Sequence, residues 1–199
     1  MKRYLMEFIG TFFLLLAIAS GNAIAIGAML AALVYVGWHV SGAHYNPAVT
    51  TAVCVNSKMT TEDYLYYICA QVCGALAGIS FWFFTTGQKW AVEASEAPIW
   101  MVLCFEAVLT FLLCAAVLAA ADLFKKKNIG EYGVIIGAAI MAISFLRGVV
   151  NPAIVISSIL FTMIMGGCGG ITTIIPFIGY IVGPFIGGWL AARAHKHLI

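Results

Sequence analysis

The chain has 199 residues, of which 63% are hydrophobic and only 9% are charged, and its formal net charge is +2. A soluble domain usually carries about 25% charged residues, so this composition excludes an ordinary soluble protein and predicts a membrane protein. Because a spanning helix needs about 20 apolar residues, the length has room for six spans and two shorter insertions.

The first half opens on Lys2-Arg3 and an apolar run, a pattern that is also typical of a signal peptide. Glu7 lies inside this run, and the run has a counterpart later in the chain, so we interpret it as a retained first span. The apolar pattern predicts spans over about 4–20, 23–40 and 60–84, and a helix too short to span over about 46–55. The third span is predicted to begin at a cap near Thr60, and the small residues at 74–78 predict close helix contact in lipid.

The second half follows a polar loop at 85–98 and repeats this order of long and short apolar segments. Spans are predicted over about 99–121, 132–145 and 173–192, with a second short helix over about 151–163. A basic loop is expected at 122–130, and the glycine-rich residues 166–170 are expected to break the chain before the last span.

The two short helices begin with the same triplet, which occurs as Asn46-Pro47-Ala48 and again as Asn151-Pro152-Ala153. Asn is a favoured N-cap residue, and Pro suits the first helical position because its missing N–H would be unpaired there anyway. Each triplet therefore predicts the start of a short helix inside the bilayer.

A longer repeat relates the two halves, because Glu7-x-x-x-Thr-Phe matches Glu106-x-x-x-Thr-Phe. Three spans per copy is an odd number, so the second copy enters the membrane inverted. We predict one domain over 1–199, an all-α membrane protein with six transmembrane helices and two half-helices in an inverted repeat. Repeat one covers about 1–84 and repeat two about 99–199, and Asn46 and Asn151 meet tip to tip.

This arrangement predicts a pore, because non-helical backbone at membrane depth is tolerated only when it lines a wet cavity or is buried in protein. The carbonyls of residues 42–45 and 148–150 would line the pore, and the two Asn amides would donate hydrogen bonds to passing oxygens. Each helix start carries about +0.5 charge, which repels cations and disfavours proton relay. The alternative is that each Asn is merely a cap.

Glu7 and Glu106 are costly inside a bilayer and need a reason to be there. One interpretation is ion transport through the carboxylates, and the other is that each accepts hydrogen bonds from N–H groups of a non-helical loop. For His44 the interpretations are a metal ligand, a pH sensor, or a structural donor near Glu106, which we favour. The six cysteines are interpreted as small apolar residues, so we predict no metal site, no cofactor and no disulfide framework.

Most cations gather at four places: the N-terminus, the end of the first short helix, the loop near residue 125 and the C-terminus. With six spans these four places share one side, which the positive-inside rule assigns to the cytoplasm. We therefore expect both termini to be cytoplasmic, in a cell (plasma or inner) membrane. The Lys125–Lys127 run is explained by topology and predicts no nucleic-acid partner.

These residues resemble the aquaporins, or major intrinsic proteins, over nearly the whole chain. The resemblance rests on residues 7–11, the run Ser41-Gly-Ala-His-Tyr-Asn-Pro-Ala-Val-Thr50, Glu106, residues 151–153 and residues 182–188. It implies a homotetramer in the lipid bilayer with one pore per subunit, which conducts water or small neutral solutes passively and excludes protons.

The second half departs from the family pattern at the selectivity filter. Ile154 stands where the family usually has Arg directly after the second triplet, and the other filter positions correspond to Ile26 and Ser144. The link into the second triplet is also shorter than usual. Arg147 lies on this link, and either its guanidinium enters the mouth in place of the missing Arg or it extends to the membrane interface.

We therefore expect a passive channel for water and not an enzyme, since no nucleophile and base converge in the sequence. An apolar filter of Ile26 and Ile154 would instead admit glycerol, ammonia or hydrogen peroxide. A membrane structural protein with a closed pore is the remaining alternative.

Overall fold

The computed structural model describes residues 1–57, 59–127, 131–167 and 174–198, and the regular secondary structure of these residues is all helical. The main bundle consists of α1 (Lys2–Ala19), α2 (Ala23–Ser41), α4 (Thr61–Thr86), α5 (Ile99–Lys127), α6 (Tyr132–Phe145) and α9 (Ile178–Leu198). The two short helices are α3 (Pro47–Asn56) and α7 (Pro152–Ile164), and a 3-10 turn, η1 (Ile175–Phe177), precedes α9.

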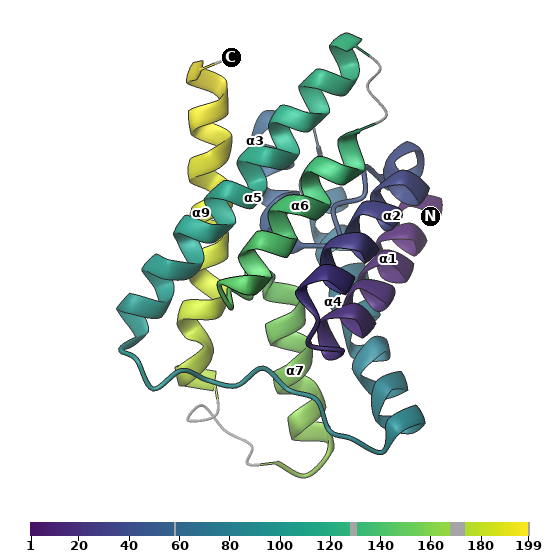
Figure 1. Cartoon of the computed structure of the whole chain (residues 1–199), viewed down its shortest axis with the longest axis vertical. Coiled ribbons are helices and arrows are strands. Elements are labelled where there is room, and N and C mark those ends of the chain that lie inside the picture. Colours follow the sequence, from purple (N-terminus) through teal and green to yellow (C-terminus); the bar gives the residue numbers. More distant parts are fainter. Residues whose placement is uncertain (58, 128–130, 168–173, 199) are drawn as a thin grey trace.

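The packing of these helices repeats between the two halves of the chain. In the first half α1 packs on α4 and in the second half α5 packs on α9, while α2 and α6 pack on each other between them. Short helix α3 packs on α9 of the other half, and α7 packs on α4 in return. Figure 1 shows α3 in the upper half of the molecule and α7 in the lower half, as the inverted repeat requires.

Not every predicted span meets a test of length and composition alone. Among the described residues, four helical segments are long and apolar enough to cross a membrane: Ala23–Ser41, Thr61–Thr86, Ile99–Asp122 and Ile175–Leu198. Helix α1 carries three charged residues in its 18, and α6 has only 14 residues, although these are among the most apolar in the chain. Both still take their predicted places, because α1 packs along α4 and α6 packs along α2.

Small residues bring the paired helices into close contact, as predicted for residues 74–78. A Cβ atom on Gly74 would lie 2.2 Å from the carbonyl oxygen of Phe8 in α1. In the other half, a Cβ on Gly187 of α9 would lie 2.2 Å from the carbonyl oxygen of Ala107 in α5. Without water to drive helices together, such backbone-to-backbone contact is a main source of helix association in lipid.

Helices α5 and α9 both continue past the ends of their predicted spans, and several residues named in the sequence analysis lie outside the described residues. The expected loop at 122–130 is helical as far as Lys127, because α5 continues past its apolar segment, and lysine is a good helix former. Residues 128–130, Lys58, and residues 168–173 with part of the glycine-rich break and Cys168 lie outside the described residues. The predicted cap at Thr60 is confirmed, since its Oγ1 accepts the N–H of Asp63 at 3.1 Å.

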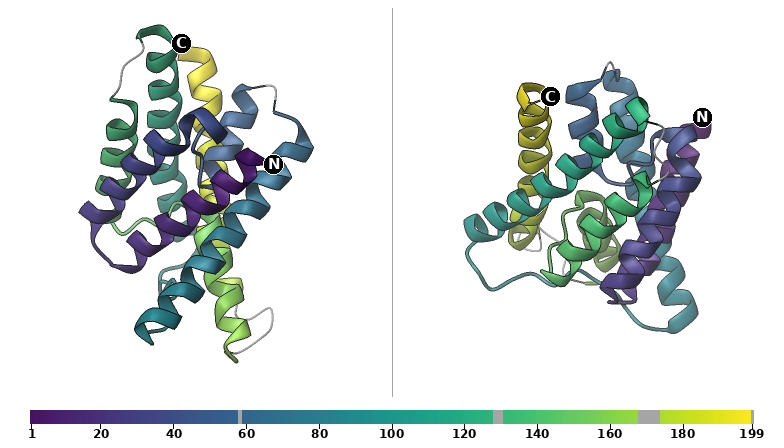
Figure 2. Two further views of the ribbon diagram at one scale, coloured as in Figure 1. Left: turned by 90° about the vertical axis from the view of Figure 1, so that its right-hand side faces the viewer. Right: turned by 45° about the horizontal axis from the view of Figure 1, so that its top comes forward.

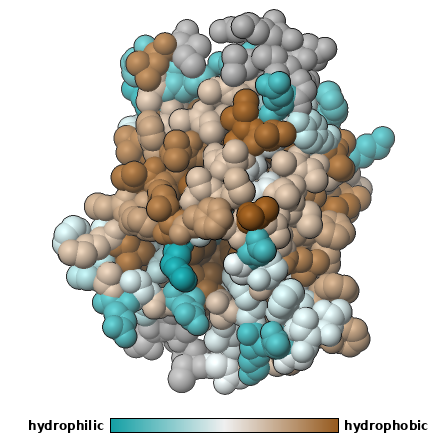
Figure 3. All heavy atoms as spheres, viewed as in Figure 1, coloured by the Kyte–Doolittle hydropathy of each residue, from teal (hydrophilic) through white to brown (hydrophobic). Residues whose placement is uncertain are grey.

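The outside of the bundle has the surface of a membrane protein. In Figure 3 the middle of the visible face is largely apolar, and hydrophilic residues gather toward its two ends. Large apolar side chains such as Phe84, Val108 and Ile164 are exposed. Cys69, Cys73 and Cys104 are also exposed on helix faces, whereas Cys114 is buried, so the cysteines are less uniformly buried than their apolar context suggested.

The two ends of the bundle carry different segments. Both termini lie in the upper half of the molecule in Figures 1 and 2. At the lower end, residues 87–98 connect α4 to α5 without regular structure and cross the molecule in Figure 1. We call residues 87–98 the strap.

Candidate functional site

The two short helices start in the same way, with an Asn cap followed by Pro. Asn46 Oδ1 accepts the N–H of Ala48 at 2.8 Å, and Asn151 Oδ1 accepts the N–H of Ala153 at 3.1 Å. Both Asn residues have extended backbone conformations, as N-caps do, and both are almost completely buried. The capping prediction is therefore confirmed for both helices.

The amide nitrogens of the two Asn residues cross between the halves of the chain. Asn46 Nδ2 donates to the carbonyl oxygen of Val150 at 2.8 Å, and Asn151 Nδ2 donates to the carbonyl oxygen of Tyr45 at 3.0 Å. Each amide has two N–H donors, and the described residues account for one of them. The crossed pair fixes both amides, and it leaves one N–H on each for an oxygen in the adjoining cavity.

The residues just before the two Asn caps are held in an unusual backbone conformation. Tyr45 and Val150 have φ values of 49° and 48°, in the left-handed region that side chains other than Gly rarely occupy. Such a residue costs about 1–3 kcal/mol and persists only where its surroundings hold it. Here the conformation presents the carbonyls of Tyr45 and Val150 to the opposite Asn.

Glu7 supports the first of these loops with both of its carboxylate oxygens. Oε1 accepts the hydroxyl of Ser41 at 2.6 Å and the N–H of His44 at 3.0 Å. Oε2 accepts the N–H of Tyr45 at 2.7 Å and the Nε2–H of Gln71 at 2.8 Å. Four donors surround this fully buried carboxylate, so its position is explained by the loop that it holds.

Glu106 supports the second loop in the same way but with fewer donors. Its Oε1 accepts the N–H of Val149 at 3.0 Å, and its Oε2 accepts the N–H of Val150 at 2.6 Å. Each Glu thus binds the loop of its own half, while each Asn binds the loop of the other half. The hydrogen bonds agree with the loop-supporting interpretation of the two carboxylates.

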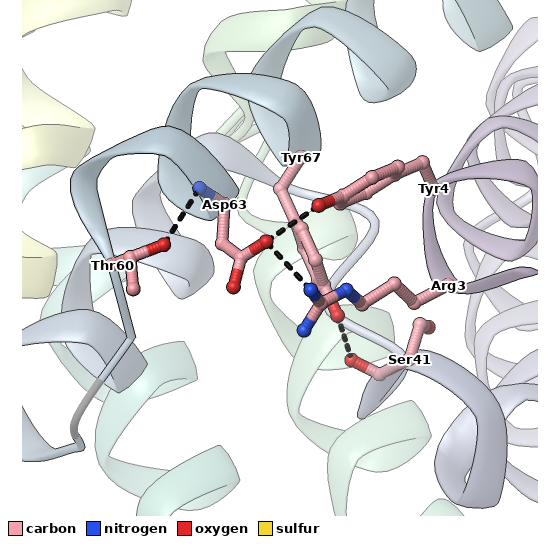
Figure 4. A network of polar contacts seen from close by, with 6 residues as sticks. All are labelled: Arg3, Tyr4, Ser41, Thr60, Asp63 and Tyr67. Atoms are coloured by element: carbon pink, nitrogen blue, oxygen red, sulfur yellow. Dashed lines mark hydrogen bonds and ion pairs between the residues drawn. The ribbon is translucent and has the colours of Figure 1, made fainter. Parts of the chain in front are cut away.

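A second layer of contacts holds Ser41 and the start of α4 (Figure 4). Tyr67 donates its hydroxyl to the carbonyl oxygen of Ser41 at 2.7 Å, which ties the end of α2 to α4. Nearby, Arg3 and Tyr4 both donate to the same carboxylate oxygen of Asp63, at 2.7 Å and 2.5 Å. These bonds join the first turns of α1 and α4 at the end of the molecule opposite the strap.

His44 has a different partner from the one predicted. Its Nδ1 lies 3.2 Å from Thr50 Oγ1, and its ring lies 5.1 Å from the ring of Tyr67. Both partners belong to the first half of the chain, so the expected hydrogen bond near Glu106 was wrong. The reason is local: Thr50 lies in the first turn of α3, only six residues after His44.

Two cavities adjoin at the centre of the molecule. The larger, the strap-side cavity, has a volume of about 1170 Å³ and is lined by Asn46 and Asn151 together with strap residues. The smaller, the tail-side cavity, has a volume of about 560 Å³ and is lined by Asn56, Asp122, His195 and Lys196 near the C-terminal end. His44 and Val117 line both cavities, so the two adjoin, with the strap at one end and the C-terminal residues at the other.

The comparisons with known proteins agree with this geometry. The family model described as "Major intrinsic protein" matches residues 19–195. The chain belongs to the major intrinsic protein family. It is therefore an integral membrane protein of a family of channels.

Several relatives match this family member over nearly its whole length. It is 30% identical to "Glycerol uptake facilitator protein-like 6" of Lactiplantibacillus plantarum, over 96% of this chain and 95% of the relative. It is also 30% identical to "Aquaporin AqpM" of Methanothermobacter thermautotrophicus, over 99% and 97% of the two chains. The X-ray structure of the aquaglyceroporin from Plasmodium falciparum matches with a TM-score of 0.85 at 20% identity, covering 99% and 96%, which shows the shared fold.

The four residues predicted for a selectivity filter all line the strap-side cavity: Ile26, Ser144, Arg147 and Ile154. Ile154 is fully buried, and Ile26 has 7% of its surface exposed. Ser144 donates its hydroxyl to the carbonyl of Ile140 at 2.7 Å, so that proton is engaged within α6. Arg147 is exposed and has a φ of 62°.

Sequence reasoning missed three groups of residues that line or support the cavities. Trp90 and Val92 of the strap line the strap-side cavity, and their signal was that they are the two large apolar residues of this loop. Gln71 joins Glu7 to Thr50, and only its apolar surroundings in α4 marked it as unusual. At the other end, His195 lies 2.8 Å from Asp122, a contact between distant segments that no local pattern indicates.

Among the described residues no group of His, Cys, Asp or Glu is placed to hold a metal.

Proposed function

We propose that this protein conducts water passively through the two adjoining cavities, past the crossed Asn pair, and excludes protons. The observation that carries the proposal is the pair of crossed amides, each with one N–H left over, in the strap-side cavity that adjoins the tail-side cavity. Two facing helix starts, each with about +0.5 charge, repel cations and orient a passing water through its oxygen. Such orientation interrupts the chain of hydrogen bonds along which a proton would move.

The experiment is stopped-flow shrinkage of liposomes that contain the purified protein, after mixing with sucrose. The proposal expects water flux above that of empty liposomes, while a pH dye inside the liposomes reports no added proton leak. Flux equal to that of empty liposomes would reject conduction and favour a structural protein with a closed pore.

A second candidate is conduction of small neutral solutes such as glycerol, ammonia or hydrogen peroxide. It is favoured by Ile26 and Ile154, two apolar residues that line the strap-side cavity, the second of them at the position where the family usually has an arginine. The name of the relative from Lactiplantibacillus plantarum points in the same direction. Replacing sucrose by glycerol in the same experiment tests it, because a permeant solute produces shrinkage followed by reswelling.

Arg147 enters the proposal as a hypothesis of its own. It is the one strap-side residue of the predicted filter that carries a charge, and it lines the cavity while remaining exposed. If its guanidinium replaces the filter arginine, Arg147→Ala should change both water shrinkage and proton leak. Unchanged behaviour in both measurements rejects this role and leaves the interface role.

We also propose that the protein is a homotetramer with one pore per chain and with both termini in the cytoplasm. The exposed apolar faces support association in lipid, and Lys2, Arg3 and Lys196 support the orientation because they lie at the end that carries both termini. Light scattering in detergent would give the mass of the assembly. Labelling of a cysteine added at either terminus in intact cells would test the orientation.

A further inference from the structure

Two residues of the strap, Trp90 and Val92, face the strap-side cavity. Of the twelve residues in 87–98, Trp90 and Val92 are half-buried, and the other ten are exposed. Side chains two positions apart in an extended chain point to the same side, so the two share one inward face. Both line the strap-side cavity, and both pack against the apolar cluster that contains Ile154, Leu15 and Ile79.

The strap is fastened to the short helix that follows the second triplet. The N–H of Val92 donates to Ser158 Oγ at 2.8 Å, across a separation of 66 residues in the sequence. Ser158 is only 2% exposed and lies one helical turn after Ile154 in α7. The same helix therefore carries the filter residue and the hydroxyl that fixes the middle of the strap.

The surface beside this anchor is apolar where the family pattern has a cation. Ile154 has no exposed surface although it lines the cavity, which agrees with its lying in the cluster that the strap covers. Ile26 lines the same cavity from α2. Of the charged residues that line the cavity, Lys89, Glu93 and Arg147 are exposed, so a solute meets a charged rim first and then an apolar constriction.

We propose that the strap is the selectivity element on this side of the passage, with Trp90 as the residue that limits solute size and Ser158 as its positioning residue. The indole closes the space beside Ile26 and Ile154 that the absent arginine would otherwise fill. The constriction then selects neutral solutes by cross-section and apolar surface, because pore diameter and lining groups set selectivity. The inference rests on the proposed channel function.

The first test removes the indole and compares it with a matched tryptophan. Trp90→Ala and Trp100→Ala both delete a tryptophan near the same end of the bundle, but Trp100 is 62% exposed and lines neither cavity described above. For each variant, the permeability to glycerol and to the larger erythritol is measured in liposomes and divided by that to water. Trp90→Ala should raise these ratios about tenfold, the effect typical of relieving a misfit of about one methylene group, while Trp100→Ala stays within about twofold of the parent.

The second test moves the strap without touching its side chains. Ser158→Ala removes the acceptor of the Val92 N–H, whereas Ser157→Ala removes a neighbouring hydroxyl that donates to the Val72 carbonyl at 2.8 Å. Ser158→Ala should raise the solute-to-water ratio in the same direction as Trp90→Ala, and Ser158→Thr, which keeps the hydroxyl, should restore it. A general packing defect would not distinguish the two serines or be rescued by threonine.

The outcomes separate this inference from the proposed function. If the parent shows no water flux, the channel proposal fails and the strap proposal falls with it. If the parent conducts water but Trp90→Ala keeps the parental ratios, the strap proposal is overturned and the channel proposal stands. Equal ratios for Ser158→Ala and Ser157→Ala would overturn the positioning role.

Discussion

The two buried carboxylates predict a difference in stability that can be worked out bond by bond. A Glu→Gln substitution turns one acceptor oxygen into an NH₂ group, which then faces the donors that the oxygen had served. Each oxygen of Glu7 accepts two hydrogen bonds, so two are lost whichever oxygen is replaced. Each oxygen of Glu106 accepts one, so one is lost.

A hydrogen bond to a charged group contributes about 1.5–3 kcal/mol, so Glu7→Gln should lower the free energy of unfolding by about 3–6 kcal/mol and Glu106→Gln by about half of that.

Rotation of the Gln71 amide does not recover the loss at Glu7. Its Nε2 also donates to Thr50 Oγ1 at 2.9 Å, and the Thr50 hydroxyl itself donates to the carbonyl of Asn46. The rotation would therefore gain one bond and lose another.

The assay is thermal unfolding of purified variants in one detergent at one scan rate, since the order of midpoints is then comparable even if unfolding is irreversible. Glu96→Gln, an exposed strap residue, is the control and should keep the parental midpoint. The expected order is parent, then Glu106→Gln, then Glu7→Gln. A midpoint for Glu7→Gln at or above that of Glu106→Gln would refute the reasoning.

Three further predictions follow from single contacts. Gly74→Ala places a carbon 2.2 Å from the carbonyl oxygen of Phe8, so its unfolding midpoint should fall by the equivalent of about 1–3 kcal/mol, and a parental midpoint would contradict the close approach. Tyr67→Phe loses a buried hydrogen bond to the end of α2, so its free energy of unfolding should fall by about 0.5–1.5 kcal/mol. Tyr66 is half exposed, so Tyr66→Phe should keep the parental unfolding midpoint. Asn46→Asp puts a negative charge between the helix starts, so a dye assay in liposomes should detect a cation leak that the parent lacks. A variant with no more cation leak than the parent would count against electrostatic exclusion.

The features that the sequence predicted well are encoded by neighbouring residues. The Asn caps, the Pro at the first helical position and the Thr60 cap need only a few adjacent residues, and the structure has all of them. The sixth helix begins and ends at the predicted residues 132 and 145, because these are the ends of its apolar run and a short link follows. The inverted order of packing also followed from the repeat.

The features that the sequence did not predict depend on contacts between distant segments. The bond from Val92 to Ser158 and the contact of His195 with Asp122 have no signature in local spacing. His44 was assigned to the wrong half because the sequence alone does not show which side chain lies beside it, and in the structure this neighbour is Thr50 in the first turn of α3. The end of α5 was placed too early because apolar residues stop before the helix does.

The central claim is that solute passes through the strap-side cavity and not along the outside of the bundle. Ile26 lines that cavity, whereas Ile24, in the same helix, is 62% exposed on the outer surface and lines neither cavity described above. The decisive measurement is the osmotic water permeability of liposomes with Ile26→Trp or Ile24→Trp at equal protein content. The account predicts that Ile26→Trp lowers the permeability about tenfold or more by filling the passage, while Ile24→Trp keeps the parental value. Equal permeability in the two variants would contradict it.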